Sequence, residues 1–252
     1  MTNALMEKLS SAEILTAEDR QLLEGLSTVA QRVPAGQDLI VEGEKPRHTR
    51  LFLSGYGCRY KGLASGERSI TSLLLPGDFC DLNGFVLGYM DHTIATISEC
   101  DVAEIPPEAM TALMADSPRV VRALWWATLV DDAIWREWLL NMGRRPADQQ
   151  LAHLFCETLA RLRASGTVRG QDFPFPLTQE QLADVIGVST VHVNRILQRL
   201  RGEELVALEG RRVIIPDPPR LAEFCGFDGA YLHLSQDGFW GRRGFWEKEP
   251  VS

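Results

Sequence analysis

The stretch from Thr190 to Arg201 mixes apolar residues with side chains that can recognise the edges of nucleic-acid bases. Arginine can donate two hydrogen bonds to guanine, asparagine can pair in the same way with adenine, and valine can contact the methyl group of thymine. Val191, Asn194 and Arg195 supply these three chemistries within little more than one helical turn. If they share one face of a helix, that face suits the major groove of DNA.

Two short helices joined by a tight turn are predicted to position these side chains. Thr178, with Gln181 three residues later, forms a capping box that opens a helix over 179–186. Gly187 can adopt the left-handed conformation that ends such a helix, and Ser189 can cap the next one. The pattern predicts a helix-turn-helix unit.

Apolar spacing separates this unit from a generic helical hairpin, which is the alternative interpretation. A generic hairpin would tolerate a bulky residue at Ala183, where a small one is needed for the two helices to touch. The other positions required to be buried are all apolar: Leu182, Ile186, Val188, Val193 and Ile196.

A β-hairpin is predicted after the second helix, with strands over 205–208 and 211–215 and a turn at Glu209-Gly210. Two arginines at its tip could meet phosphates, as a wing does. The full set of expected DNA contacts is Thr178, Gln179, Ser189, Thr190, Val191, His192, Asn194, Arg195, Gln198, Arg199, Arg211 and Arg212.

Upstream, short β-rich runs separated by glycine-containing turns predict a small antiparallel β-roll between about residues 29 and 105. The predicted strands are 38–41, 50–53, 58–62, 69–75, 93–97 and 101–105.

A long helix over 118–143 follows, opened by Pro118 and closed before Pro146. Apolar cover on two faces favours pairing with a second copy, and a core helix of a monomer is the alternative. A second apolar stripe, with Val121, Trp125, Leu129 and Trp135, runs beside the first. The stripe assigned to the dimer helix is Val120, Leu124, Ala127, Asp131, Ile134 and Trp138.

These segments together resemble the Crp/Fnr superfamily of bacterial transcription regulators. The specific part is the run Leu177-Thr178-Gln179-Glu180-Gln181-Leu182-Ala183-Asp184-Val185-Ile186-Gly187-Val188-Ser189, continued by Val193-Asn194-Arg195-Ile196-Leu197. Upstream, the turn Pro76-Gly77-Asp78-Phe79 and the strand ending Val102-Ala103-Glu104-Ile105 resemble the family's cyclic-nucleotide-binding-like domain.

The resemblance implies an α+β protein with a β-roll sensor domain over 1–117, a dimerisation helix over 118–143, a winged helix-turn-helix over 144–228 and a tail over 229–252. It implies a homodimer that reads a near-palindromic site in double-stranded DNA, with RNA polymerase as a partner if the protein is an activator. Arg195 matches the family's guanine-reading arginine, whereas Val191 departs from its usual acidic residue.

The sensor half departs from the family's cyclic-nucleotide binders, which use Gly-Glu for the ribose and Arg-Ser or Arg-Thr for the phosphate. At the expected effector pocket this chain has Gly77, Asp78, Asp81, His92 and Thr93, and no lysine or arginine between Arg68 and Arg119. Because a buried phosphate without a cation is costly, the chain is not expected to bind cyclic AMP in the usual way.

Cofactors and catalysis are not expected either. Five cysteines stand singly, and residues 1–57 lack the cysteine cluster that would hold iron and sulfur. His48, His92 and Cys80 are candidates for haem ligation, but a lone histidine near a turn usually bonds water or backbone. P-loop, HExxH and GxSxG motifs are absent, so no metal, cofactor or enzyme activity is predicted.

Length and charge fit a globular regulator of 252 residues, without the run of about 18 apolar residues that would cross a membrane. No export signal opens the chain, so a cytoplasmic location is expected.

The net charge of −8 falls on residues 1–143, with 12 basic and 20 acidic residues, while residues 144–252 are neutral with 14 of each. A neutral DNA-binding half keeps open a ligand-sensing or protein-interaction module without strong DNA affinity. The aromatic tail is expected to dock on the body or a partner, or to fray.

Overall fold

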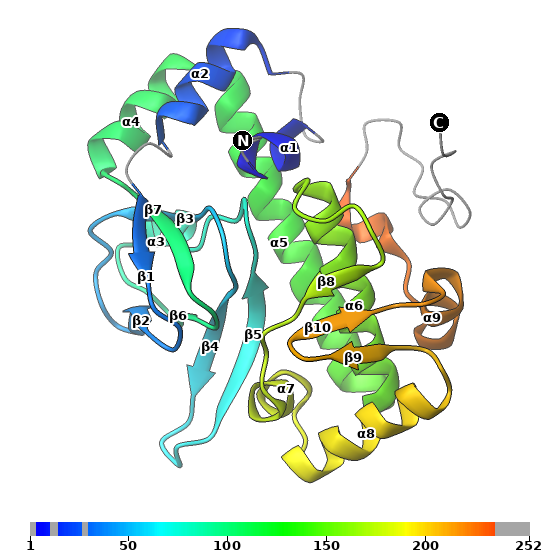
Figure 1. The fold of residues 1–252 in the computed structure, drawn as a ribbon. Coiled ribbons are helices and arrows are strands. Elements are labelled where there is room, and N and C mark those ends of the chain that lie inside the picture. The colour runs from blue at the N-terminus through cyan, green and yellow to red at the C-terminus, as the bar shows by residue number, and fades with distance from the viewer. Residues whose placement is uncertain (1–3, 11–14, 27–29, 235–252) are drawn as a thin grey trace, which may run out of the picture.

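The computed structural model describes residues 4–10, 15–26 and 30–234. A β-roll with flanking helices lies on one side, the long helix α5 (Pro118–Arg144) runs through the middle, and a smaller domain with its own sheet lies on the other side (Figure 1). Helices and antiparallel sheets combine in this way in the α+β class, so the predicted fold class is confirmed.

Two antiparallel sheets form the β-roll, and their inner side chains, including Phe52, Ile94 and Val102, are fully buried. The first sheet has the order β1 (Ala30–Val33), β7 (Cys100–Ile105), β3 (Thr49–Phe52). The second has the order β2 (Asp38–Ile40), β6 (Thr93–Thr96), β4 (Gly57–Gly62), β5 (Arg68–Leu74). Strand β1 was not predicted, because only Val33 of its four residues is buried and no alternation marks it. A short helix, α3 (Leu82–Leu87), follows β5.

Three helices pack around the first half of α5: α1 (Ala4–Ser10), α2 (Ala17–Leu26) and α4 (Pro107–Asp116). The Ser117 hydroxyl caps α5 by accepting from the amide of Val120, and it donates to the buried carboxylate of Asp19 at 2.6 Å. Gly77 joins α1 to the roll: its φ is +91°, and an added Cβ would lie 2.8 Å from the carbonyl oxygen of Ala4. A side chain at residue 77 would therefore force α1 away from the roll.

The apolar stripe of α5 that was predicted to contact a second copy is buried within the single chain. Val120, Leu124, Ala127, Ile134 and Trp138 are at most 7% exposed, because they pack against their own chain. A stripe covered in this way has no surface left for a second copy. The exposed side of α5 instead carries the second stripe, in which Trp125 is 67% exposed.

The C-terminal domain begins with α6 (Ala147–Ala164), after Arg145 and Pro146 have interrupted the long helix. The helix-turn-helix is α7 (Gln179–Ile186) and α8 (Thr190–Gly202). Its sheet has the order β8 (Asp172–Pro174), β10 (Arg212–Ile214), β9 (Ala207–Glu209). Three residues of the segment between α6 and α7 form β8 by pairing with β10. Helix α9 (Pro218–Cys225) and a 3-10 turn, η1 (Gly229–Leu232), follow.

The start of the predicted tail docks on the body, where Tyr231 donates from its hydroxyl to Glu157 at 2.8 Å. The remaining aromatic residues of the tail, Phe239, Trp240, Phe245 and Trp246, lie outside the described residues. None of the described helices is long and apolar enough to cross a membrane.

All five cysteines are buried and free: Cys58, Cys80, Cys100, Cys156 and Cys225. Burial raises the pKa of Cys58 to about 12 and that of Cys100 to about 11. Their thiols are therefore protonated near neutral pH.

Candidate nucleic-acid interface

Local capping fixes the angle between α7 and α8, as predicted. Thr178 accepts from the amide of Gln181, whose side chain in turn accepts from the amide of Thr178 at 2.9 Å. Gly187 ends α7 with a φ of +69°, and Ser189 caps α8 by accepting from the amide of His192. The apolar residues predicted to lie between the helices are buried, apart from half-buried Val188.

The outer face of α8 is open to solvent. Val191 is 61% exposed, Arg195 and Gln198 are exposed, and Asn194 is half-buried. No hydrogen bond or ion pair to the Arg195 guanidinium is formed by the residues that the structure describes. The face that was predicted to enter the major groove is thus available to a ligand.

Two of the expected contact arginines form ion pairs within the chain. Arg199 donates to Asp148 at 2.5 Å and to Glu203 at 2.8 Å. Arg212 is ion-paired with Asp172. Both guanidinium groups are about half exposed, although Asp148 itself is buried, so phosphates could reach them only by displacing a carboxylate.

The wing differs from the prediction by one residue. Strand pairing of Glu209 with Arg212 places the two-residue turn at Gly210 and Arg211, not at Glu209 and Gly210. Gly210 supplies the left-handed φ of +59° that this turn requires. Arg211 therefore lies at the tip and is exposed, while Arg212 belongs to β10.

The C-terminal domain packs closely against the β-roll of the same chain. Arg68 of β5 donates to Asp184 of α7 at 2.7 Å, and the Tyr56 hydroxyl donates to the carbonyl oxygen of Pro174. Apolar residues of both parts, including Leu73 and Phe175, belong to one continuous core.

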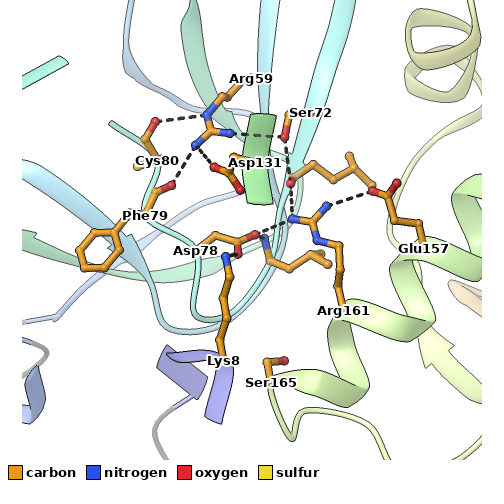
Figure 2. A network of polar contacts seen from close by, with 12 residues as sticks. Lys8, Arg59, Ser72, Asp78, Phe79, Cys80, Asp131, Glu157, Arg161 and Ser165 are labelled. Carbon is orange, nitrogen blue, oxygen red and sulfur yellow. Dashed lines mark hydrogen bonds and ion pairs between the residues drawn. The ribbon is translucent and has the colours of Figure 1, made fainter. Parts of the chain in front are cut away.

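A buried ionic network crosses the same boundary (Figure 2). The Asp78 carboxylate accepts from Lys8 of α1 at 2.6 Å and from Arg161 of α6 at 2.7 Å. Arg161 also donates to the carbonyl oxygen of Leu73 and to Glu157. Burial alone would raise the pKa of Asp78, but Lys8, Arg161 and the Leu75 amide outweigh it and lower that pKa to about 2.

The predicted effector residues separate into two groups. Asp81 and His92 line a pocket between the roll and α5. Gly77 and Asp78 face α1 and α6 instead, and the Thr93 hydroxyl accepts from the amide of Glu42. Burial raises the pKa of Asp81 to about 6, although Arg50 donates to that carboxylate from its amide at 2.6 Å and its guanidinium at 3.1 Å.

Arg59 is a pocket residue that the sequence analysis missed, because it precedes the interval from Arg68 to Arg119 in which a phosphate-binding cation is expected. Its guanidinium donates to Asp131 at 3.1 Å and to the carbonyl oxygens of Phe79 and Cys80 (Figure 2). The signal was present in the sequence: an arginine inside a predicted strand next to apolar residues must find buried partners. Lys8, the other cation of the pocket lining, lies in α1.

Two family models match the chain. Residues 149–224 match a Crp-like helix-turn-helix domain, and residues 30–117 match a cyclic nucleotide-binding domain. The transcriptional activator protein FnrL of Cereibacter sphaeroides is 33% identical over 200 residues, which span 77% of this chain and 79% of FnrL. The transcriptional activator protein Anr of Pseudomonas protegens is 25% identical and spans 84% of this chain and 86% of Anr.

The chain belongs to the Crp/Fnr superfamily of transcription regulators. The solved structure of FixK2 from Bradyrhizobium japonicum has the same fold, with a TM-score of 0.68, 22% identity, and coverage of 77% of this chain and 96% of that one. As a Crp/Fnr-type regulator, the protein is a DNA-binding transcription regulator, and α7, α8 and the β9–β10 wing form its DNA-binding motif.

Proposed function

We propose that the protein acts as a homodimer that reads a near-palindromic DNA site with α8 of each copy, without using cyclic AMP. In this proposal residues 1–117 form the sensor-like domain and residues 118–143 the dimerisation helix. Residues 144–228 form the DNA-binding domain, and residues 229–252 form the tail. The observation that carries the DNA part is the open face of α8, where Arg195 points to solvent without a partner among the described side chains. Thr190, Val191, His192 and Gln198 share that exposed face.

A heptad pattern on α5 supports the homodimer. The outward side carries Val121, Trp125, Thr128, Asp132, Trp135, Leu139 and Met142, which alternate in spacings of four and three residues. Such spacing is typical of a coiled-coil seam. Four of these seven residues are large, apolar and at least 37% exposed in the single chain: Trp125, Trp135, Leu139 and Met142. A second copy of the helix would cover them and set the distance between the helix-turn-helix motifs of the two copies.

The charges of the sensor pocket support independence from cyclic AMP. Carboxylates of Asp81, Asp91, Asp131 and Asp132 line it, against the two cations Lys8 and Arg59. Both cations are already paired with aspartates, so an anionic ligand would meet a net negative wall.

FnrL and Anr are both named transcriptional activators, and by analogy we propose RNA polymerase as a protein partner at promoters. The runner-up is a regulatory module with weak DNA affinity, favoured by the neutral charge of residues 144–252 and by the paired state of Arg199 and Arg212.

Selection of duplexes from a randomised DNA pool by the purified protein tests the proposal. We expect a palindrome to be enriched, with an affinity that falls steeply with salt and does not change when cyclic AMP is added. Enrichment of no site, with weak binding that is flat against salt, would favour the runner-up. A saturable tightening of DNA binding by millimolar cyclic AMP would contradict the effector part alone.

A further inference from the structure

A side-chain hydrogen bond links the first residue of α7 to the reading helix. Asn194 donates from Nδ2 to Oε1 of Gln179 at 3.3 Å, across 15 residues of sequence. The capping box at Thr178 fixes the backbone of Gln179, and the left-handed Gly187 fixes the crossing of the two helices. Gln179 is therefore held where its side chain can reach Asn194.

Asn194 occupies the α7 side of the reading face. Successive helix residues are about 100° apart, so Asn194 lies roughly 100° from Arg195, with Val191 and Gln198 between them in projection. Arg195 lies on the opposite flank, in a groove that Asp148 and Phe224 also line. The two side chains thus face different edges of the face that would enter the major groove.

The hydrogen bond from Asn194 to Gln179 determines which way the side-chain amide of Asn194 points. A free asparagine side chain can present either its oxygen or its nitrogen to a base, because rotation about its last bond exchanges them. An acceptor at Gln179 binds one hydrogen of Nδ2 and so fixes the orientation of the amide. One Nδ2 hydrogen and Oδ1 remain free, which is the donor and acceptor pair that adenine requires in the major groove.

We propose that Gln179 is a positioning residue for Asn194 and that the two together select an A·T base pair in each half-site. The inference rests on the proposed DNA-reading function. Gln179 acts through the amide orientation of Asn194, and its own Nε2 group remains free to donate to the DNA backbone.

Discrimination at a single base pair tests this role. The probe is the duplex that the wild-type protein selects from a randomised pool, together with duplexes changed at one symmetric position at a time. The position read by Asn194 is the one where Asn194→Ala abolishes discrimination, with an expected loss of roughly 5- to 100-fold. Two substitutions at residue 179, one of them also combined with Asn194→Ala, then separate positioning from other roles.

Gln179→Met keeps the shape but removes the acceptor, and we expect it to lose several-fold discrimination at that position only. Gln179→Glu keeps an acceptor and loses the donor, so discrimination should persist while the added charge weakens binding to all duplexes alike. In the Asn194→Ala background, Gln179→Met should change discrimination no further. A thermal midpoint equal to that of the wild type shows that each variant is folded.

The inference is overturned if Gln179→Met discriminates like the wild type, if Gln179→Glu loses discrimination as Gln179→Met does, or if Asn194→Ala keeps every base preference. These outcomes leave the DNA-reading function intact, because the wild type still selects its site. Failure of the wild type to select any site would overturn the function and the inference together.

Discussion

Arg161 and Asp78 form an ion pair of 2.7 Å across the boundary between the DNA-binding domain and the β-roll. Both side chains are at least nine-tenths buried, and each has a further charged partner, Glu157 and Lys8 respectively. Since a buried charge must be paired, the position of α6 relative to the roll is set by this network rather than by apolar packing alone.

Asp78→Asn should therefore destabilise the whole protein. The substitution leaves Arg161 without a carboxylate at the boundary and Lys8 without its partner, a change that costs about 3–5 kcal/mol for a buried pair. Urea unfolding followed by circular dichroism measures the loss. Glu42→Gln is the control, because it removes an exposed ion pair with Lys61 and should cost less than about 1 kcal/mol. Equal effects of the two substitutions would show that the network adds no stability.

Acid should weaken the same network in a defined range. The pKa of Asp78 is lowered to about 2 in the folded protein from an ordinary value of 3.8. A lowered carboxyl pKa contributes stability that is fully present above the ordinary value and is lost as the pH falls towards 2. The free energy of unfolding of the wild type should thus fall more steeply below about pH 4 than that of Asp78→Asn. Parallel curves for the two proteins would contradict the assignment.

Arg195→Ala and Arg211→Ala should fail in different ways. Arg195 lies on the reading face, so its loss should cost about 1–3 kcal/mol and relax selectivity at one base position. Arg211 lies at the tip of the wing, so its loss should weaken binding to all sequences and reduce the salt dependence. Fluorescence anisotropy measures the affinity of both variant proteins for the selected duplex and for duplexes changed at one position. An equal loss on every duplex for both proteins would show that α8 does not read the bases.

Leu139→Glu should separate the two copies of the protein. Leu139 is 64% exposed on the heptad stripe, and covering it in each copy contributes about 1.5–3 kcal/mol. Sedimentation velocity should show a monomer. Fluorescence anisotropy should show that most of its DNA affinity is lost. Leu63→Glu, at an equally exposed leucine in the β4–β5 turn, should leave the dimer unchanged. Leu124→Glu is not a suitable test, because Leu124 is buried in its own chain and the charge would unfold the domain. A Leu139→Glu dimer as stable as the wild type would refute the seam.

The helix-turn-helix could be predicted because its determinants are local. The capping residues Thr178 and Ser189 and the left-handed Gly187 act within one turn of the helices that they delimit. The same holds for the glycine-bounded strands of the roll. Strands β1 and β8 have only four and three residues, and their pairing partners are distant in sequence, so no local pattern marked them.

The role of Asp78 could not be predicted for the same reason. Its two cations lie 70 and 83 residues away in sequence, and nothing near the Pro76-Gly77 turn indicates which of them will approach. On α5, periodicity identified two apolar stripes but not which one the chain covers by itself. That choice depends on where the roll and α6 pack, which is a property of the tertiary structure.

Because all five native thiols are buried, they should not compete for labels that react with an exposed cysteine. A buried thiol is shielded from maleimides and disulfide reagents and reacts with them slowly. A single cysteine introduced on the surface would then carry a probe without removal of the natural ones. Met142→Cys would place one such probe on each copy at the proposed α5 seam, where the separation of two spin labels would test how the helices pair.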